Sequence, residues 1–144
     1  MTKTIREIIA EKGTNVHCIN MDATVFQALE LMSTKNIGAL VVKKDDNVVG
    51  IISERDFARK VALQDRTPKD TTVEDIMTTD ICYISPEKPV EEGLAIMTER
   101  RCRHLPVFEN DQMIGVVSIG DLVKAQVEEK ELIIAHLESY IKGG

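Results

Sequence analysis

Long apolar runs and an excess of positive charge are both lacking in this chain of 144 residues. No apolar run approaches the roughly 20 residues that a helix needs to span a bilayer, and the N-terminal residues lack the apolar core of a signal peptide. We therefore expect a cytoplasmic protein with no membrane partner. The net charge of −6 argues against a nucleic-acid-binding protein, because affinity for a duplex depends on cations that neutralise phosphates.

Cysteines at metal-binding or disulfide spacing are missing as well. The three cysteines, Cys18, Cys82 and Cys102, are scattered, and no two of them form a C-x-x-C motif. Neither a disulfide framework nor a zinc site is therefore expected. We interpret the three as small buried thiols in a reducing compartment.

Motifs of common enzyme classes are also lacking. The chain contains no G-x-x-x-x-G-K-[ST] phosphate loop, no nucleophile elbow and no H-E-x-x-H helix. Glu54 and Asp56 are close in sequence, but an i, i+2 spacing does not bring two side chains together on a helix. We predict that the protein is not an enzyme and has no metal site.

An internal repeat is present instead, and it spans Thr14 to Leu122 without a gap. Shifting the sequence by 65 residues superimposes it on itself, as Gly50 on Gly115 shows. Other identical pairs include Thr14 with Thr79, Ile19 with Ile84, Val25 with Val90, Leu29 with Leu94, Met32 with Met97, Leu40 with Leu105, Val42 with Val107, Ser53 with Ser118 and Asp56 with Asp121.

Each copy predicts a strand, a helix, two strands and a second helix. In the first copy the strands are expected at 16–19, 39–42 and 48–52. The first helix carries an apolar stripe from Val25 to Met32, with Asp22 and Thr24 as candidate caps, and the second helix begins near Ser53. The second copy follows the same order, with strands at 81–84, 105–108 and 113–118 and a helix at 89–97.

This pattern predicts an α+β fold built from two β-α-β-β-α units. A unit of about 60 residues is marginal alone, so we expect the copies to pack sheet to sheet about a pseudo-twofold axis, with flanking terminal helices. The predicted domains are 1–75, the first repeat with a leading helix, 76–127, the second repeat, and 128–144, an amphipathic helix. That last helix either covers the pair's own core or packs against a second subunit.

The phrase that ends each unit has the form G-h-h-S-x-x-D-h, where h is apolar. It runs from Gly50 to Phe57 in the first copy and from Gly115 to Leu122 in the second. One interpretation is a helix cap in which the serine and the acidic residue three positions later bond each other's backbone. The other is a nucleotide site, because a helix N-terminus suits phosphate and a carboxylate can hold ribose hydroxyls. The two interpretations are compatible.

The repeat order together with this phrase resembles the CBS domain family, whose domains occur in pairs called Bateman modules. The stretch Arg103–Val107 resembles the family's H-R-h-P-V strand, with the first two residues in the order Arg-His, and 73–78 resembles its lead-in. The resemblance implies a regulatory, non-catalytic and often homodimeric energy sensor that modulates an unknown partner protein. It also implies an adenosine-containing ligand, AMP, ADP, ATP or NAD(H) rather than S-adenosylmethionine.

The resemblance also implies site residues, in clefts between the repeats. Asp56 and Asp121 would hold ribose, and Ser53 and Ser118 would contact ribose or phosphate. We expect the better phosphate site at Asp56, with Ser53, Arg55, Arg103 and His104. An alternative for His104 is a histidine that only packs in the fold. An alternative for the cluster of Arg100, Arg101 and Arg103 is the solvated end of a helix. The residues expected to enclose adenine are Val16, His17, Ile37, Gly38, Ala39, Ile81 and Cys82.

Residues 53–61 further resemble stand-alone CBS-pair proteins of bacteria and plant organelles, in which AMP or NAD is a plausible ligand. The leading hypothesis is thus an adenosine-nucleotide sensor. The alternative is a homodimeric interaction module whose nucleotide cleft is vestigial or empty.

Overall fold

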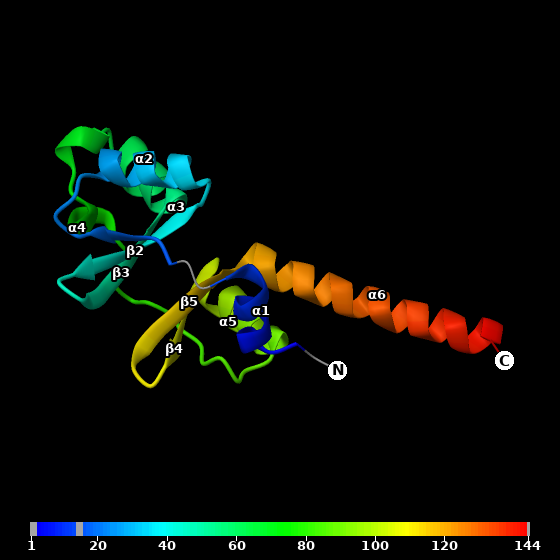
Figure 1. The fold of residues 1–144 in the computed structure, drawn as a ribbon. Coiled ribbons are helices and arrows are strands. Elements are labelled where there is room, and N and C mark those ends of the chain that lie inside the picture. The colour runs from blue at the N-terminus through cyan, green and yellow to red at the C-terminus, as the bar shows by residue number, and fades with distance from the viewer. Residues whose placement is uncertain (1–2, 14–15, 144) are drawn as a thin grey trace. The chain divides into compact units, whose positions relative to one another are not determined.

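The structure is a computed structural model that describes residues 3–13 and 16–143. Its elements form two compact units (Figure 1). The first-repeat unit comprises Val16–Ile81, and the second-repeat unit comprises Met1–Asn15 together with Cys82–Gly144. Thr14, with which the repeat alignment begins, lies outside the described residues. The predicted sheet-to-sheet packing of the two copies stays a prediction.

A three-stranded sheet forms the centre of the first-repeat unit, in the order β1-β2-β3. β1 (Cys18–Asn20) runs parallel to β2 (Ala39–Lys44), which pairs antiparallel with β3 (Asn47–Ser53). The crossover helix α2 (Val25–Lys35) begins with a capping box, in which Thr24 and Gln27 bond each other's backbone N–H groups. After β3 come α3 (Glu54–Phe57), a π-helical turn (Ala58–Ala62), a 3-10 turn (Pro68–Asp70) and α4 (Val73–Ile76).

The core of the first-repeat unit lies between α2 and the sheet. Val25, Ala28 and Met32 are buried because their i, i+3, i+7 spacing places them on one face of α2. The other buried members are Leu40, Val42 and Ile52 of the sheet, Val61 of the π-helical turn, and Val73 and Ile76 of α4.

The described residues of the second-repeat unit form a hairpin and three helices. The hairpin joins β4 (His104–Glu109) and β5 (Gln112–Ser118) in antiparallel register. Its helices are α1 (Ile5–Lys12), α5 (Val90–Arg100) and α6 (Ile119–Gly143), the last of which runs through the boundary expected at residue 127. The α+β class and the β-α-β-β-α order of both repeats are confirmed.

The leading strand differs between the two copies. The stretch 81–84 is reduced to a single parallel bridge between Ile84 and Val107. In the first copy, the N–H of Val41 donates to the carbonyl of His17 at 3.1 Å. Pro106 occupies the position equivalent to Val41 and has no N–H, so the corresponding ladder bond cannot form in the second copy.

Each leading helix packs with the repeat that is farther away in the sequence. Ile5, Ile8 and Ile9 of α1 are buried in the core of the second repeat, and the N–H of Ile5 donates to the carbonyl of Lys88 at 2.9 Å. α4, which opens the second repeat in sequence, packs instead into the core of the first. The order of the repeats along the sequence predicts the ranges 1–75, 76–127 and 128–144. The two compact units are defined instead by which residues contact one another.

Within residues 3–13 and 16–143, no helix is both long enough and apolar enough to cross a bilayer.

Candidate functional site

Strand register gathers the first-copy site residues at one end of the sheet. Ala39 at the start of β2 pairs with Ser53 at the end of β3. The carbonyl of Gly38 accepts the N–H of Glu54 at 3.1 Å, and the carbonyl of His17, just before β1, accepts the N–H of Val41. The stretches 16–17, 37–39 and 53–56 therefore meet where β3 passes into α3.

Asp56 is saturated by protein donors. It is only 8% exposed, and it is the one buried acidic residue in the described part of the chain. Its Oδ2 accepts the N–H of Ser53 at 2.9 Å and the Ser53 hydroxyl at 3.1 Å. Its Oδ1 accepts the hydroxyl of Thr78 at 3.1 Å and lies 3.0 Å from Nζ of Lys60. Since a carboxylate offers about four acceptor positions, a ribose would have to displace one of these donors.

Asp121 occupies the equivalent position in the second-repeat unit with different partners. Its Oδ2 accepts the N–H of Ser118 at 2.8 Å and Nζ of Lys12 at 2.6 Å, while the Asp121 N–H donates to the Ser118 hydroxyl at 3.1 Å. Lys12 also donates to the carbonyl of Val116 at 3.0 Å. The carboxylate is more open than that of Asp56, with 26% of its side chain exposed against 11%.

The charges around Asp121 shift two pKa values. Burial raises the pKa of Asp121, but hydrogen bonds from Lys12 and Ser118 outweigh it and hold the pKa below its usual value. His104 lies opposite Ser118 in the hairpin. Burial lowers the pKa of His104, and the charge of Lys12 lowers it further, so the imidazole is neutral at pH 7.

The serine and aspartate of each motif form the predicted cap. Ser53 caps α3 with a complete capping box, and Ser118 and Asp121 make the same backbone bonds at the start of α6. Capping is thus a structural role of both motifs, and the nucleotide interpretation stays compatible with it.

The site residues inferred from sequence divide between the two units. Those in the first-repeat unit are Val16, His17, Ile37, Gly38, Ala39, Ser53, Arg55, Asp56 and Ile81. Those in the second-repeat unit are Cys82, Arg103, His104, Ser118 and Asp121. The expected phosphate site at Asp56 draws on both units, through Arg55 on one side and Arg103 and His104 on the other, and it stays a prediction.

Three donors to the aspartates were missed by sequence reasoning. Lys60 follows Asp56 by four residues, a spacing from which a helical ion pair can be predicted. Thr78 and Lys12 come from the lead-in segments, at 22 and 109 residues from their aspartates. No local signal in the sequence points to those two contacts.

The three cysteines, Cys18, Cys82 and Cys102, are partly buried. Cys82 and Cys102 pack against the core of the second-repeat unit. Burial and the neighbouring Cys82 thiol raise the pKa of Cys102 to about 11, so it is a poor nucleophile at neutral pH. In the described ranges 3–13 and 16–143, no three His, Cys, Asp or Glu side chains gather into a possible metal site.

Comparison with known proteins gives a consistent family. The family model of the CBS domain matches residues 5–63 and 73–128. The chain is 40% identical over 150 residues to the mitochondrial CBS domain-containing protein CBSX3 of Arabidopsis thaliana, covering 98% of this chain and 73% of that one.

Two solved structures share the fold. The first is a putative signal-transduction protein with CBS domains from Burkholderia ambifaria, at 43% identity and a TM-score of 0.85, with 88% of this chain and 95% of that chain covered. The second is the hexameric CBS-CP12 protein of bloom-forming cyanobacteria, at 30% identity and a TM-score of 0.76, with 85% and 67% covered. The two matched segments and the duplicated β-α-β-β-α units together assign this chain to the CBS domain family, as a tandem CBS pair.

Proposed function

We propose that this CBS pair binds an adenosine nucleotide, AMP, ADP, ATP or NAD(H), and thereby regulates a partner protein without catalysing a reaction. The observation that supports the proposal most is the duplicated motif carboxylate. In both units an aspartate lies in the first helical turn after a hairpin strand, and it is held by the serine that ends that strand. Such a carboxylate is suited to accept ribose hydroxyls.

The two carboxylates would accept a ribose at different cost. Binding at Asp56 requires a donor such as the Ser53 hydroxyl or Lys60 to move aside. Asp121 is more exposed and stands beside Lys12, whose ammonium group is suited to a phosphate oxygen. We therefore extend the proposal to two unequal sites, with Lys12 as an additional cation for the Asp121 site, alongside the expected set of Arg55, Arg103 and His104 at Asp56.

Regulation requires that the nucleotide prefer one state of the pair. A ligand shifts a conformational equilibrium only by the difference between its affinities for the two states. The regulated partner is a protein of unknown identity, and we propose that the pair also self-associates. The name of the plant relative places that protein in mitochondria, so the cytoplasmic location expected from the sequence stays a prediction.

Thermal unfolding with a nucleotide panel tests nucleotide binding. A ligand at 100 times its Kd adds about 2.7 kcal/mol to the unfolding free energy, a shift on the order of 5–10 °C in Tm. We expect at least one of AMP, ADP, ATP and NAD(H) to give this shift. No shift with any of them at millimolar concentration would contradict the proposal.

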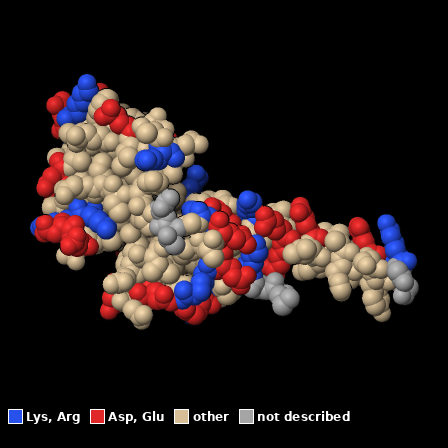
Figure 2. Space-filling model, in the orientation of Figure 1, with Lys and Arg blue, Asp and Glu red and all other residues tan. Residues whose placement is uncertain are grey.

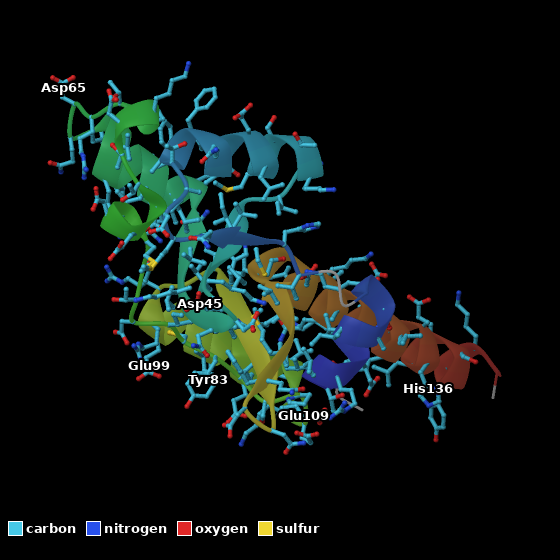
Figure 3. The ribbon with its side chains drawn as sticks, turned by 60° about the vertical axis from the view of Figure 1, so that its left-hand side comes forward. Asp45, Asp65, Tyr83, Glu99, Glu109 and His136 are labelled. Carbon is cyan, nitrogen blue, oxygen red and sulfur yellow. The ribbon has the colours of Figure 1, made fainter. Side chains whose placement is uncertain are left out.

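Asparagine variants locate the binding. Asp56→Asn and Asp121→Asn keep the shape of each side chain and remove its charge, so each should abolish the nucleotide-induced shift at its own site. The matched control is Asp45→Asn, in the turn between β2 and β3 (Figure 3). Asp45 has a positive φ of 55°, which asparagine tolerates, and the turn is at the other end of the hairpin from Ser53. A shift that survives in the double Asn variant would exclude these carboxylates.

The second candidate is an interaction module with an empty cleft. The four protein donors around Asp56 favour it, because the carboxylate is fully satisfied without a ligand. In that case the double Asn variant should keep its protein partners, and partner binding should not respond to nucleotides.

A further inference from the structure

Within the part of the chain that the structure describes, the distal half of α6 buries no side chain. Leu122 and Ala125 are buried in the core of the second-repeat unit, close to the start of the helix. From residue 130 to residue 142 every side chain is exposed. A helix segment this short is marginal in water on its own, so the distal half needs a surface to pack against.

An apolar stripe follows α6 on a face other than the one that meets the core. The α6 stripe consists of Val123, Val127, Lys130, Ile134, Leu137 and Ile141. Its spacings alternate between four and three residues, which is the heptad pattern of a coiled coil. Its apolar members are between 44% and 79% exposed. Figure 2 shows uncharged side chains over much of the distal half of α6, and Figure 3 shows His136 pointing away from the helix.

We propose that the α6 stripe forms a two-stranded coiled coil with α6 of a second copy of this chain. One set of core positions carries the β-branched residues Val127, Ile134 and Ile141. The other set carries Val123, Lys130 and Leu137. The two sets together form one narrow seam along the helix, and such a self-complementary stripe is satisfied by its own copy.

The charges favour an antiparallel arrangement. A parallel pair would place Lys130 directly against the partner's Lys130 in the apolar seam. An antiparallel pair centred near residue 132 places Lys130 against the partner's Ile134 and Val127 against the partner's Leu137. In the same register Lys124 faces the partner's Glu138 on the flank of the seam, and Ile133 faces the partner's Ile133. The Lys124–Glu138 pair forms twice, once at each end, whereas the one like-charge contact on that flank is Glu131 against the partner's Glu131. Opposite charges on the flanks of a coiled coil set its orientation.

The seam from Val123 to Ile141 is about 28 Å long at 1.5 Å per residue. The proposed self-association of the pair would thus occur through the α6 stripe. Formation of this coiled coil does not depend on nucleotide binding. Measuring the nucleotide-induced Tm shift of each variant below separates a failure of this interface from a failure of the nucleotide proposal.

Sedimentation equilibrium of the full chain tests the interface. We expect a reversible monomer–dimer equilibrium at micromolar concentration, the weak end of the range of protein interfaces. Leu137→Asp should weaken dimerisation by more than about tenfold, because a buried leucine would become a charge. The matched control is Leu132→Asp, on the same helix at 70% exposure but off the stripe, which should leave the dimer unchanged. A monomer at all concentrations, or a dimer that survives Leu137→Asp, would overturn the proposal.

Charge exchange tests the orientation. Lys124→Glu and Glu138→Lys should each weaken the dimer by placing like charges opposite one another. The double variant restores opposite charges only where Lys124 faces the partner's Glu138, so recovery of the wild-type dimer supports the antiparallel seam. A double variant that associates no better than the single ones would rule that register out.

Discussion

At the scale of single residues, the two copies of the motif differ mainly in the cation next to the aspartate. Lys60, from the same repeat, forms an ion pair with Asp56, and the equivalent residue of the second repeat is Ala125. Lys12, from α1, forms an ion pair with Asp121, and the residue equivalent to Lys12 in the other copy is Met77. The two equivalent aspartates are thus each paired with a lysine, but the lysines come from different parts of the chain. This difference is a physical basis for unequal sites.

Lys12→Met, which copies the residue of the other repeat, should raise the pKa of Asp121. The pKa of Asp121 is below its usual value in the folded protein, so ionised Asp121 stabilises the fold above its unfolded pKa, and this is lost as the pH falls through the folded pKa. The variant should therefore lose about 1 kcal/mol or less at pH 7, as expected of a partly exposed pair, and nothing once Asp121 is protonated.

Urea unfolding at pH 7 and in acid, with an NMR titration of Asp121, measures both effects. Lys3→Met serves as control, because Lys3 pairs with Glu11 and Glu128 instead. If Lys12→Met left the pKa of Asp121 unchanged, the ion pair between Lys12 and Asp121 would not contribute to that pKa in solution.

At the scale of elements, Gly50 lets β3 approach Met77 and Thr78, the two residues that follow α4. A Cβ at Gly50 would lie 2.9 Å from the carbonyl oxygen of Thr78 and 2.9 Å from the sulfur of Met77. The N–H and the carbonyl of Thr78 both bond to Ile51, so this backbone cannot easily move. At the equivalent Gly115 the atoms nearest to such a Cβ all belong to the side chain of Ile9, the first of them at 3.1 Å.

Gly50→Ala should therefore cost more stability than Gly115→Ala. We expect the first to lower the unfolding free energy by about 1–3 kcal/mol through overpacking. The second should cost less, because the end of an isoleucine side chain can rotate away from the added methyl group. Chemical denaturation of the two variants gives the comparison, and equal losses would contradict the assignment of the clash to the Thr78 backbone.

At the scale of the whole molecule, the second-repeat unit joins two segments that are distant in sequence, whereas the first-repeat unit is continuous. α1 joins the second repeat through Ile5, Ile8 and Ile9, and α4 joins the first through Val73 and Ile76. The first of these connections makes the stability of the second-repeat unit depend on the N-terminal residues of the chain.

Ile8→Ala should destabilise the second-repeat unit in particular. Ile8 is 4% exposed, and removing such a side chain costs about 2–5 kcal/mol. Native-state hydrogen exchange should show faster exchange in β4 and β5 than in the wild type, with less change in α2 and β2. Glu11→Ala, on the exposed face of the same helix, is the control. An equal or larger loss of protection in the first-repeat unit would contradict the location of α1.

The sequence alone was sufficient for the duplication, the order of elements and the capping role of Ser53, because these depend on local periodicity and on contacts three residues apart. It also indicated an amphipathic C-terminal helix, because Ile133, Leu137 and Ile141 fall at i, i+4, i+8. Only the tertiary structure decided that Lys12 reaches Asp121 and that α1 packs with the second repeat. An amphipathic helix shows in its sequence that one face must be buried, whereas the surface that buries it is set by packing with residues distant along the chain.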